Sequence, residues 1–148
     1  AIPEPQEIAF PTILPGFPQP LLRAYQKETT IAEKLHALVV LERTNSRMKD
    51  FFDLYLLSSE FAFSADRLSS AVRDAFARQG TPLPVETPDG LTLDFAQDPA
   101  KQQQWGAFVR QNVPPPMDTL TLPQAVEGMA LFLLPVLKAA RDRTDWQA

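Results

Sequence analysis

The sequence predicts a mainly α protein, in which a bundle of about five helices follows an extended, proline-rich N-terminal arm. Two observations lead to this fold class. From residue 30 onwards, apolar residues recur at helical spacing in five stretches, each bounded by residues that cap or break helices. Residues 1–27 contain six of the fifteen prolines, which forbid a helix through most of that segment. We therefore expect an arm over 1–27, with short edge strands at 7–10 and 21–25, and a helical domain over 28–148.

The first two predicted helices form an antiparallel hairpin. The first covers about 30–43 and starts at a capping box made by Thr30 and Glu33. The second covers about 47–59 and follows Ser46, a residue type that caps helices well. Because the link between them has only three polar residues, the two helices should lie side by side.

Three further helices are predicted beyond this hairpin, each with its own start signal. The loop over 81–97 either is irregular or contains a small hairpin that joins Val85 to Leu93. The start and stop residues are Ser64 and Gly80 for the third helix, Asp98 with Pro99 for the fourth, and Thr121 with Gln124 for the fifth.

Composition excludes several classes of protein. A chain of 148 residues with 45% hydrophobic and 22% charged residues is ordinary for a globular domain. The net charge of -4 argues against the coating of nucleic acid but leaves room for a local basic pocket. Without cysteine there is no disulfide and no thiolate metal site. Since the apolar runs fall short of the roughly 20 residues of a membrane span, we expect a cytoplasmic protein with no membrane partner.

The charged residues of the first two helices form the most informative pattern. Lys34 lies in register with the apolar face of the first helix, where a solvated lysine is unusual. The second helix is apolar around most of its circumference, and its one narrow polar stripe consists of Lys49, Asp50 and Asp53. A mostly buried helix rarely carries three charges without a reason. In an antiparallel hairpin Lys34 would lie only about 4 to 9 Å farther from the turn than the aspartates, a gap that long side chains can bridge.

Two interpretations of these charges stay open on the pattern alone. In the structural one, Lys49 pairs with Asp53 and Arg47 pairs with Asp50, while the stem of Lys34 packs along apolar surface and its ammonium reaches water. In the functional one, a single cleft holds the lysine and both carboxylates. Such a cleft could grip a triphosphate and position or deprotonate an acceptor.

Four other residues are assigned structural roles. Glu33 has a sufficient task in the capping box. His36, which is the only histidine, lies on the polar side of its helix and is predicted to be a surface residue. Trp105 and Phe108 are predicted to be core residues, because platforms that stack nucleic-acid bases lie among basic residues.

Two motifs resemble the paired late motifs of the AbiEii/AbiGii nucleotidyltransferase toxin family. They are ETTIAEKLHA over 28–37 and RMKDFFDL over 47–54, and the similarity continues through 78–82, 91–112 and 132–136. The fold of that family is similar to the DNA polymerase beta superfamily, with an N-terminal sheet that bears a Gly-Ser or Gly-Gly turn and a metal-binding acidic pair. This sequence has neither motif. The resemblance is therefore to a C-terminal half, and the start of the chain is expected to lie just downstream of the acidic strands.

The resemblance implies a toxin that uses Mg²⁺ to transfer a nucleotide from an NTP to an acceptor such as tRNA or a protein, within a toxin-antitoxin or abortive-infection pair. By the same resemblance Lys34 contacts the nucleotide phosphates and Asp50 is the acidic residue of the last motif. The candidate site residues are Asp50 and Asp53 as catalytic carboxylates and Lys34, Arg47 and Lys49 as nucleotide-binding cations, with no metal ligand.

The resemblance also bears on what this chain does by itself. Because nucleotidyl transfer needs metal ions held by clustered carboxylates, the chain alone is expected to be inactive and to hold no cofactor. Its expected partners are the N-terminal nucleotidyltransferase half, an antitoxin protein and a tRNA acceptor. The alternative is a non-catalytic helical module that binds an antitoxin or another partner chain.

Overall fold

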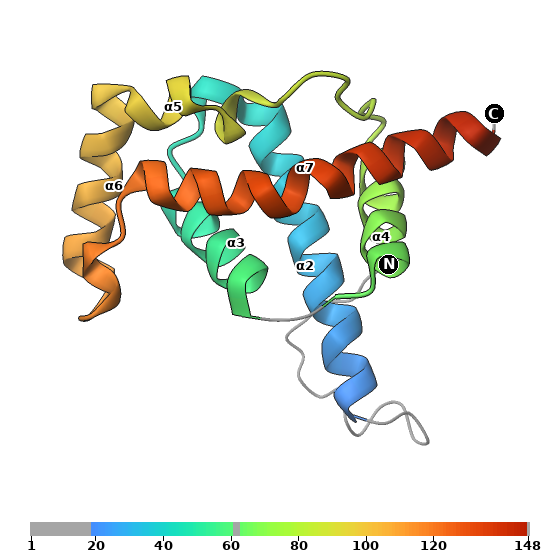
Figure 1. The fold of residues 1–148 in the computed structure, drawn as a ribbon, viewed down its shortest axis with the longest axis horizontal. Coiled ribbons are helices and arrows are strands. Elements are labelled where there is room, and N and C mark those ends of the chain that lie inside the picture. Colours follow the sequence, from blue (N-terminus) through green and yellow to red (C-terminus); the bar gives the residue numbers. More distant parts are fainter. Residues whose placement is uncertain (1–18, 61–62, 148) are drawn as a thin grey trace.

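The fold is mainly α, as the sequence predicts. The structure is a computed structural model, and it describes the backbone of residues 19–60 and 63–147 and the side chains of residues 27–59 and 63–142. Among these residues there is no strand (Figure 1). The helices are α2 (Gln19–Leu41), α3 (Met48–Glu60), α4 (Ala65–Arg78), α5 (Leu93–Gln97), α6 (Pro99–Asn112) and α7 (Leu122–Gln147), with short 3-10 helices η1 (Glu42–Thr44), η2 (Asp89–Leu91) and η3 (Met117–Thr119).

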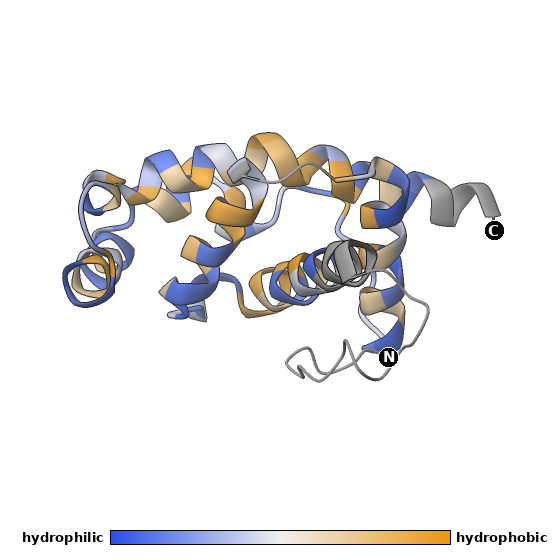
Figure 2. Ribbon diagram, turned by 90° about the horizontal axis from the view of Figure 1, so that it is seen from below, coloured by the Kyte–Doolittle hydropathy of each residue, from blue (hydrophilic) through white to orange (hydrophobic). Residues whose placement is uncertain are grey.

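The apolar core lies between α7 and the helices that it crosses. α7 packs against α3, α4 and α5, and α2 packs against α4 and α3. The middle of α7 is mostly hydrophobic, and the helix continues through Pro135 (Figure 2). Side chains that lose all or nearly all of their exposure come from six helices: Ile31, Leu35, Phe51, Leu54, Val72, Phe76, Phe95, Trp105, Met129 and Leu133.

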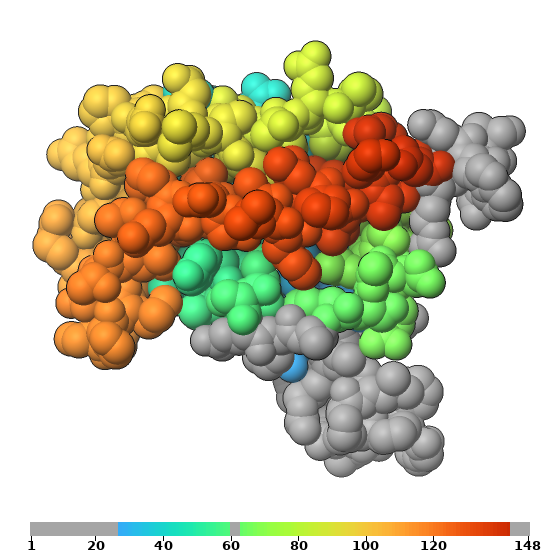
Figure 3. Space-filling view, viewed as in Figure 1, coloured from blue at the N-terminus to red at the C-terminus, as the bar shows by residue number. Residues whose placement is uncertain are grey.

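α7 runs across one whole face of the molecule, between α5 with its preceding loop and α3 with α4 (Figure 3). By length and composition, Leu122–Asp142 is apolar enough to cross a membrane. In this fold, however, Leu133 and Leu137 are buried in the core, whereas Leu131 is 75% exposed on the outer side. α7 therefore places one apolar side in the core and leaves other apolar residues exposed.

The N-terminal part of α2 differs from the prediction. The helix begins at Gln19, so both the extended arm over 19–27 and the edge strand at 21–25 are wrong. Pro20 falls in the first turn of the helix, where a missing N–H breaks no helical hydrogen bond. The supposed capping box of Thr30 and Glu33 lies inside the helix. Residues 1–18, with the predicted strand at 7–10, lie outside the described residues.

The later helix starts are confirmed. The Ser64 hydroxyl accepts from the N–H of Arg67 at 3.2 Å, and the Asp98 carboxylate accepts from the N–H of Ala100 at 2.8 Å. The Gln124 side-chain oxygen accepts from the N–H of Thr121 at 2.9 Å, and the Thr121 hydroxyl accepts from the N–H of Gln124 at 3.2 Å. Local side-chain chemistry thus determines where these helices begin.

The predicted end of α4 is also confirmed. Gly80 has a φ of +68°, which an L side chain rarely adopts, and the N–H of Thr81 donates to the Phe76 carbonyl at 2.9 Å. Two local predictions are wrong. Asn45 rather than Ser46 supplies the side-chain acceptor before α3, and no hairpin joins Val85 to Leu93, because η2 and α5 occupy that stretch.

Gly128 lets α7 approach α3 closely. A Cβ atom at this position would lie 2.9 Å from Cε1 of Tyr55, whereas a Cβ at Gly106 in α6 would meet only the flexible end of Arg110 at 3.4 Å. We expect Gly128→Ala to lower the free energy of unfolding by about 1–3 kcal/mol through overpacking. Gly106→Ala, the matched control, should raise it by up to about 1 kcal/mol, because alanine favours helix. Urea denaturation of both variants checks this, and equal effects would contradict it.

Candidate functional site

Five charged side chains meet where α2 faces α3, and we call them the charged cluster: Lys34, Arg47, Lys49, Asp50 and Asp53. The Lys34 ammonium donates a hydrogen bond to Oδ1 of Asp50 at 2.8 Å and lies 3.3 Å from Oδ2 of Asp53. Lys49 donates to the same Asp53 oxygen at 2.8 Å. Arg47 Nη2 lies 2.7 Å from Oδ2 of Asp50. The structure therefore brings together all five residues that the sequence singled out.

The sequence explains this meeting. Ile31, Leu35 and Leu38 bury one face of α2, and Met48, Phe51 and Leu54 bury one face of α3. With these two faces in the core, the intervening positions on both helices come together at the rim of the core. The short connection through η1 keeps α2 and α3 in contact.

Exposure within the charged cluster increases from its centre to its edge. The side chains of Asp50, Lys34 and Asp53 are 13, 21 and 24% exposed, whereas Arg47 and Lys49 are 56 and 74% exposed. The lysine–aspartate centre is thus mostly shielded, and the two outer cations face solvent. A ligand that arrived from solvent would meet positive charge first.

Electrostatics keep Lys34 charged. Burial alone would lower the pKa of Lys34, but the hydrogen bond and charge of Asp50, together with those of Asp53, outweigh burial and raise it above the ordinary lysine value. Three cations against two carboxylates leave the charged cluster with an excess of one positive charge. The pairs of the structural interpretation, Lys49 with Asp53 and Arg47 with Asp50, are also present, so the two interpretations are not exclusive.

One carboxylate oxygen at the centre is held by an ion pair alone. Oδ2 of Asp50 is buried and accepts no hydrogen bond of ordinary geometry from a described residue, but it lies 2.7 Å from Nη2 of Arg47, with which it forms an ion pair. A ligand that drew Arg47 away would therefore meet a carboxylate oxygen able to accept a hydrogen bond.

The charged cluster does not fit Mg²⁺. A magnesium site needs hard oxygen ligands with little competing positive charge. Here the only two carboxylates are already paired with three cations, and within 27–59 and 63–142 no group of three or more acidic or histidine side chains could hold a metal. The arrangement instead suits an anion with several oxygens, such as a polyphosphate.

Arg43, which the sequence analysis did not single out, makes the most extensive set of ion pairs among the described residues. Its guanidinium donates to both oxygens of Asp89 at 2.7 and 2.8 Å, to Asp94 at 2.9 Å and to Asp98 at 3.1 Å. The hydrogen bonds that the guanidinium donates to Asp89 and Asp94 raise the pKa of Arg43. No local signal could have found this set, because its partners lie 46 to 55 positions further along the chain.

Lys101 is a second charged residue that the sequence analysis missed. It is only 5% exposed, and its ammonium donates to the backbone carbonyl of Asn45 at 2.8 Å and to the Gln104 side chain at 3.3 Å. A buried lysine needs such partners. Its position two residues after Pro99, in the first turn of α6, gave no hint of burial.

His36 and Glu28 lie on the side of α2 that faces α4. His36, predicted to be a surface residue, is half-buried and has partners: its Nε2 lies 2.8 Å from the Thr81 hydroxyl, and its ring meets Phe76 edge-on. Burial lowers the pKa of His36. Glu28 is 2% exposed and is paired with Arg67 at 3.1 Å, and its burial raises its pKa. Both residues tie α2 to α4 rather than belonging to the charged cluster.

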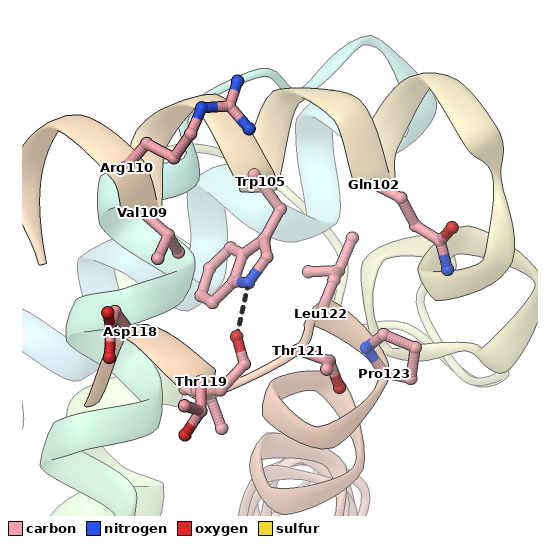
Figure 4. Close-up of a pocket in the computed structure, with 11 residues that line it drawn as sticks. Gln102, Trp105, Val109, Arg110, Asp118, Thr119, Thr121, Leu122 and Pro123 are labelled. Carbon is pink, nitrogen blue, oxygen red and sulfur yellow. Dashed lines mark hydrogen bonds between the residues drawn. The ribbon is translucent and has the colours of Figure 1, made fainter. Parts of the chain in front are cut away.

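A groove of about 520 Å³ lies between α6 and the start of α7 (Figure 4). Trp105 and Leu122 line it, with Arg110 and Asp118 at its margins. The indole N–H of Trp105 donates to the Leu120 carbonyl at 2.9 Å, and Trp105 is 4% exposed. The assignment of Trp105 to the core is therefore confirmed. No residue of the charged cluster lines this groove.

A comparison with protein families gave a match over most of the chain. The family model described as "Nucleotidyl transferase AbiEii toxin, Type IV TA system" matches residues 1–141. No curated protein and no solved structure matches the chain. The match covers both α2 and α3 and so includes the entire charged cluster.

Proposed function

Because the chain belongs to the AbiEii nucleotidyltransferase toxin family, we propose that it forms the nucleotide-binding side of a toxin that transfers a nucleotide from an NTP to an acceptor, either a tRNA or a protein. The observation that supports this most directly is the charged cluster. It combines an excess of positive charge with two carboxylates, and its central side chains are mostly shielded from solvent at the edge of the core. Transfer of a charged phosphoryl group needs this combination of neutralisation and positioning.

The proposed roles follow from position. Lys34, Arg47 and Lys49 hold the triphosphate and neutralise the charge that develops on it, while Asp50 and Asp53 hold the acceptor hydroxyl. In the reaction the acceptor oxygen forms a bond to the α-phosphorus as the bond to the bridging oxygen breaks. Pyrophosphate leaves with that electron pair, and the hydroxyl proton passes to a carboxylate. The magnesium expected for the reaction would have to be held by residues other than this cluster.

The partners belong to the same proposal. The family description names a toxin-antitoxin system, which implies an antitoxin. We place the protein in the cytoplasm, where nucleoside triphosphates and tRNA are present.

Titration with a polyphosphate tests the proposal. We expect inorganic tripolyphosphate and ATP to shift the NMR signals of Lys34 and of 47–53, and Lys49→Ala to weaken the affinity about three- to tenfold at low salt. The matched control is Lys138→Ala, since Lys138 pairs with Asp142 at i,i+4 as Lys49 does with Asp53, at 2.9 against 2.8 Å. If both variants lose the same affinity, or the shifts lie elsewhere, nucleotide binding at the cluster is refuted and the non-catalytic module becomes the better description.

A further inference from the structure

The turn between α2 and α3 has a strained backbone. α2 ends at Leu41, and the next residue, Glu42, has a φ of +49°, in the left-handed region that residues other than glycine rarely occupy. Strain of this kind persists only where surrounding contacts hold the backbone in place. Glu42 itself is exposed, so the restraint must come from its neighbours in the turn.

The first restraint is Arg43. Its guanidinium donates four hydrogen bonds to carboxylates on three successive elements: Asp89 in η2, Asp94 in α5 and Asp98 at the start of α6. Two guanidinium nitrogens bind the two carboxylate oxygens of Asp89, which fixes the orientation of the Arg43 side chain as well as its distance from Asp89. The other oxygen of Asp98 caps α6, so η1, which directly follows α2, is tied to the start of α6.

The second restraint acts on the following residues. The buried ammonium of Lys101 holds the carbonyl of Asn45, and the Asn45 side chain accepts the N–H of Arg47, immediately before α3. On α3 itself, the ring of Phe51 stacks on Phe95 at a centroid distance of 5.2 Å. The segment 89–101 therefore contacts the chain on both sides of the turn between α2, which carries Lys34, and α3, which carries Asp50.

We propose that Arg43 is a positioning residue for the charged cluster: by holding the turn between α2 and α3, it sets the register in which Lys34 meets Asp50 and Asp53. Arg43 lies nine positions after Lys34 and seven before Asp50, so a rotation of the turn would move the two helices relative to one another. Distances of 2.8 and 3.3 Å allow little movement before an ion pair is lost. The nucleotide-binding readout of this inference rests on the proposed function.

The test compares Arg43→Gln with Arg67→Gln, because each removes a guanidinium that ties α2 to a neighbouring segment. Arg67 pairs with the buried Glu28, far from the turn in sequence. Both variants are measured well below their melting temperatures, with ATP as the ligand and with the side-chain ammonium signal of Lys34 as a report on its ion pairs. We expect Arg43→Gln to weaken ATP affinity about tenfold and to broaden or shift the Lys34 signal. Arg67→Gln should change affinity less than about twofold, even where it lowers the melting temperature as much.

The outcomes separate this inference from the proposed function. Unchanged ATP affinity in Arg43→Gln, or an equal loss in Arg67→Gln, overturns the positioning role. If the unmodified chain binds no ATP, the proposed function fails, and the NMR signal of the Lys34 ammonium alone tests the positioning role of Arg43. A change of that signal in Arg43→Gln but not in Arg67→Gln supports the role, and no change in Arg43→Gln refutes it. Should either glutamine variant not fold, Arg43→Lys and Arg67→Lys replace the pair, since lysine keeps the charge but loses the two-pronged geometry.

Discussion

Lys34→Ala is expected to reduce nucleotide transfer by the proposed toxin at least about 100-fold, with a small change in stability. Of the residues that the structure describes, Lys34 is the only cation that contacts both carboxylates of the charged cluster. In the proposed function, its removal takes away a phosphate contact at the shielded centre. Asp50 would keep Arg47 and Asp53 would keep Lys49, so no carboxylate is left alone, and the cost in stability should be about 1 kcal/mol or less. Transfer of label from α-³²P-labelled NTPs to tRNA or protein, with thermal denaturation alongside, measures both effects.

The control for this experiment is Lys138→Ala, which removes an exposed lysine of α7 and should leave transfer unchanged. Transfer that survives in Lys34→Ala would discard the site. Loss of activity in parallel with several kcal/mol of stability would instead show that Lys34 is a structural residue.

Phe95→Ala is expected to lower the free energy of unfolding by about 3–5 kcal/mol. Phe95 has no exposed surface and stacks on Phe51 with nearly parallel rings. The Arg43 guanidinium and the Lys101 ammonium lie 5.6 and 5.5 Å from its ring centroid, so the substitution also removes two cation–π contacts.

Leu93→Ala provides the comparison, because Leu93 lies in the same short helix but is 62% exposed. It should change stability by no more than about 0.5 kcal/mol in urea denaturation. If the two variants lose similar stability, α5 contributes through its helical structure rather than through the ring of Phe95.

The parts of the fold that the sequence predicts best are those set by neighbouring residues. Ser64, Asp98 and Thr121 begin their helices as expected, since each cap satisfies a backbone group within three positions of itself. The meeting of Lys34 with Asp50 was predictable for a similar reason. A short link and two helical periodicities restrict where those side chains can lie.

The rest depended on contacts between distant segments or on a rule applied too broadly. Pro20 does not break the helix, because the first turn of a helix tolerates proline. α2 therefore begins at Gln19, well before the predicted start near residue 30. The burial of Lys101 and the edge-on contact of His36 with Phe76 arise from packing between helices that only the folded chain brings together. The functional roles of the five cluster residues are still predictions.

The cations of the charged cluster already have carboxylate partners, so a polyphosphate bound as proposed would have to compete with Asp50 and Asp53 for them. Ligands with several anionic oxygens can replace both aspartates at once, whereas a single phosphate replaces one and gains less. In the proposed reaction, Asp50 and Asp53 would then be close enough to pair with Lys34 again once a smaller anion is left. The same carboxylates that compete with the incoming ligand would thus favour release of the product.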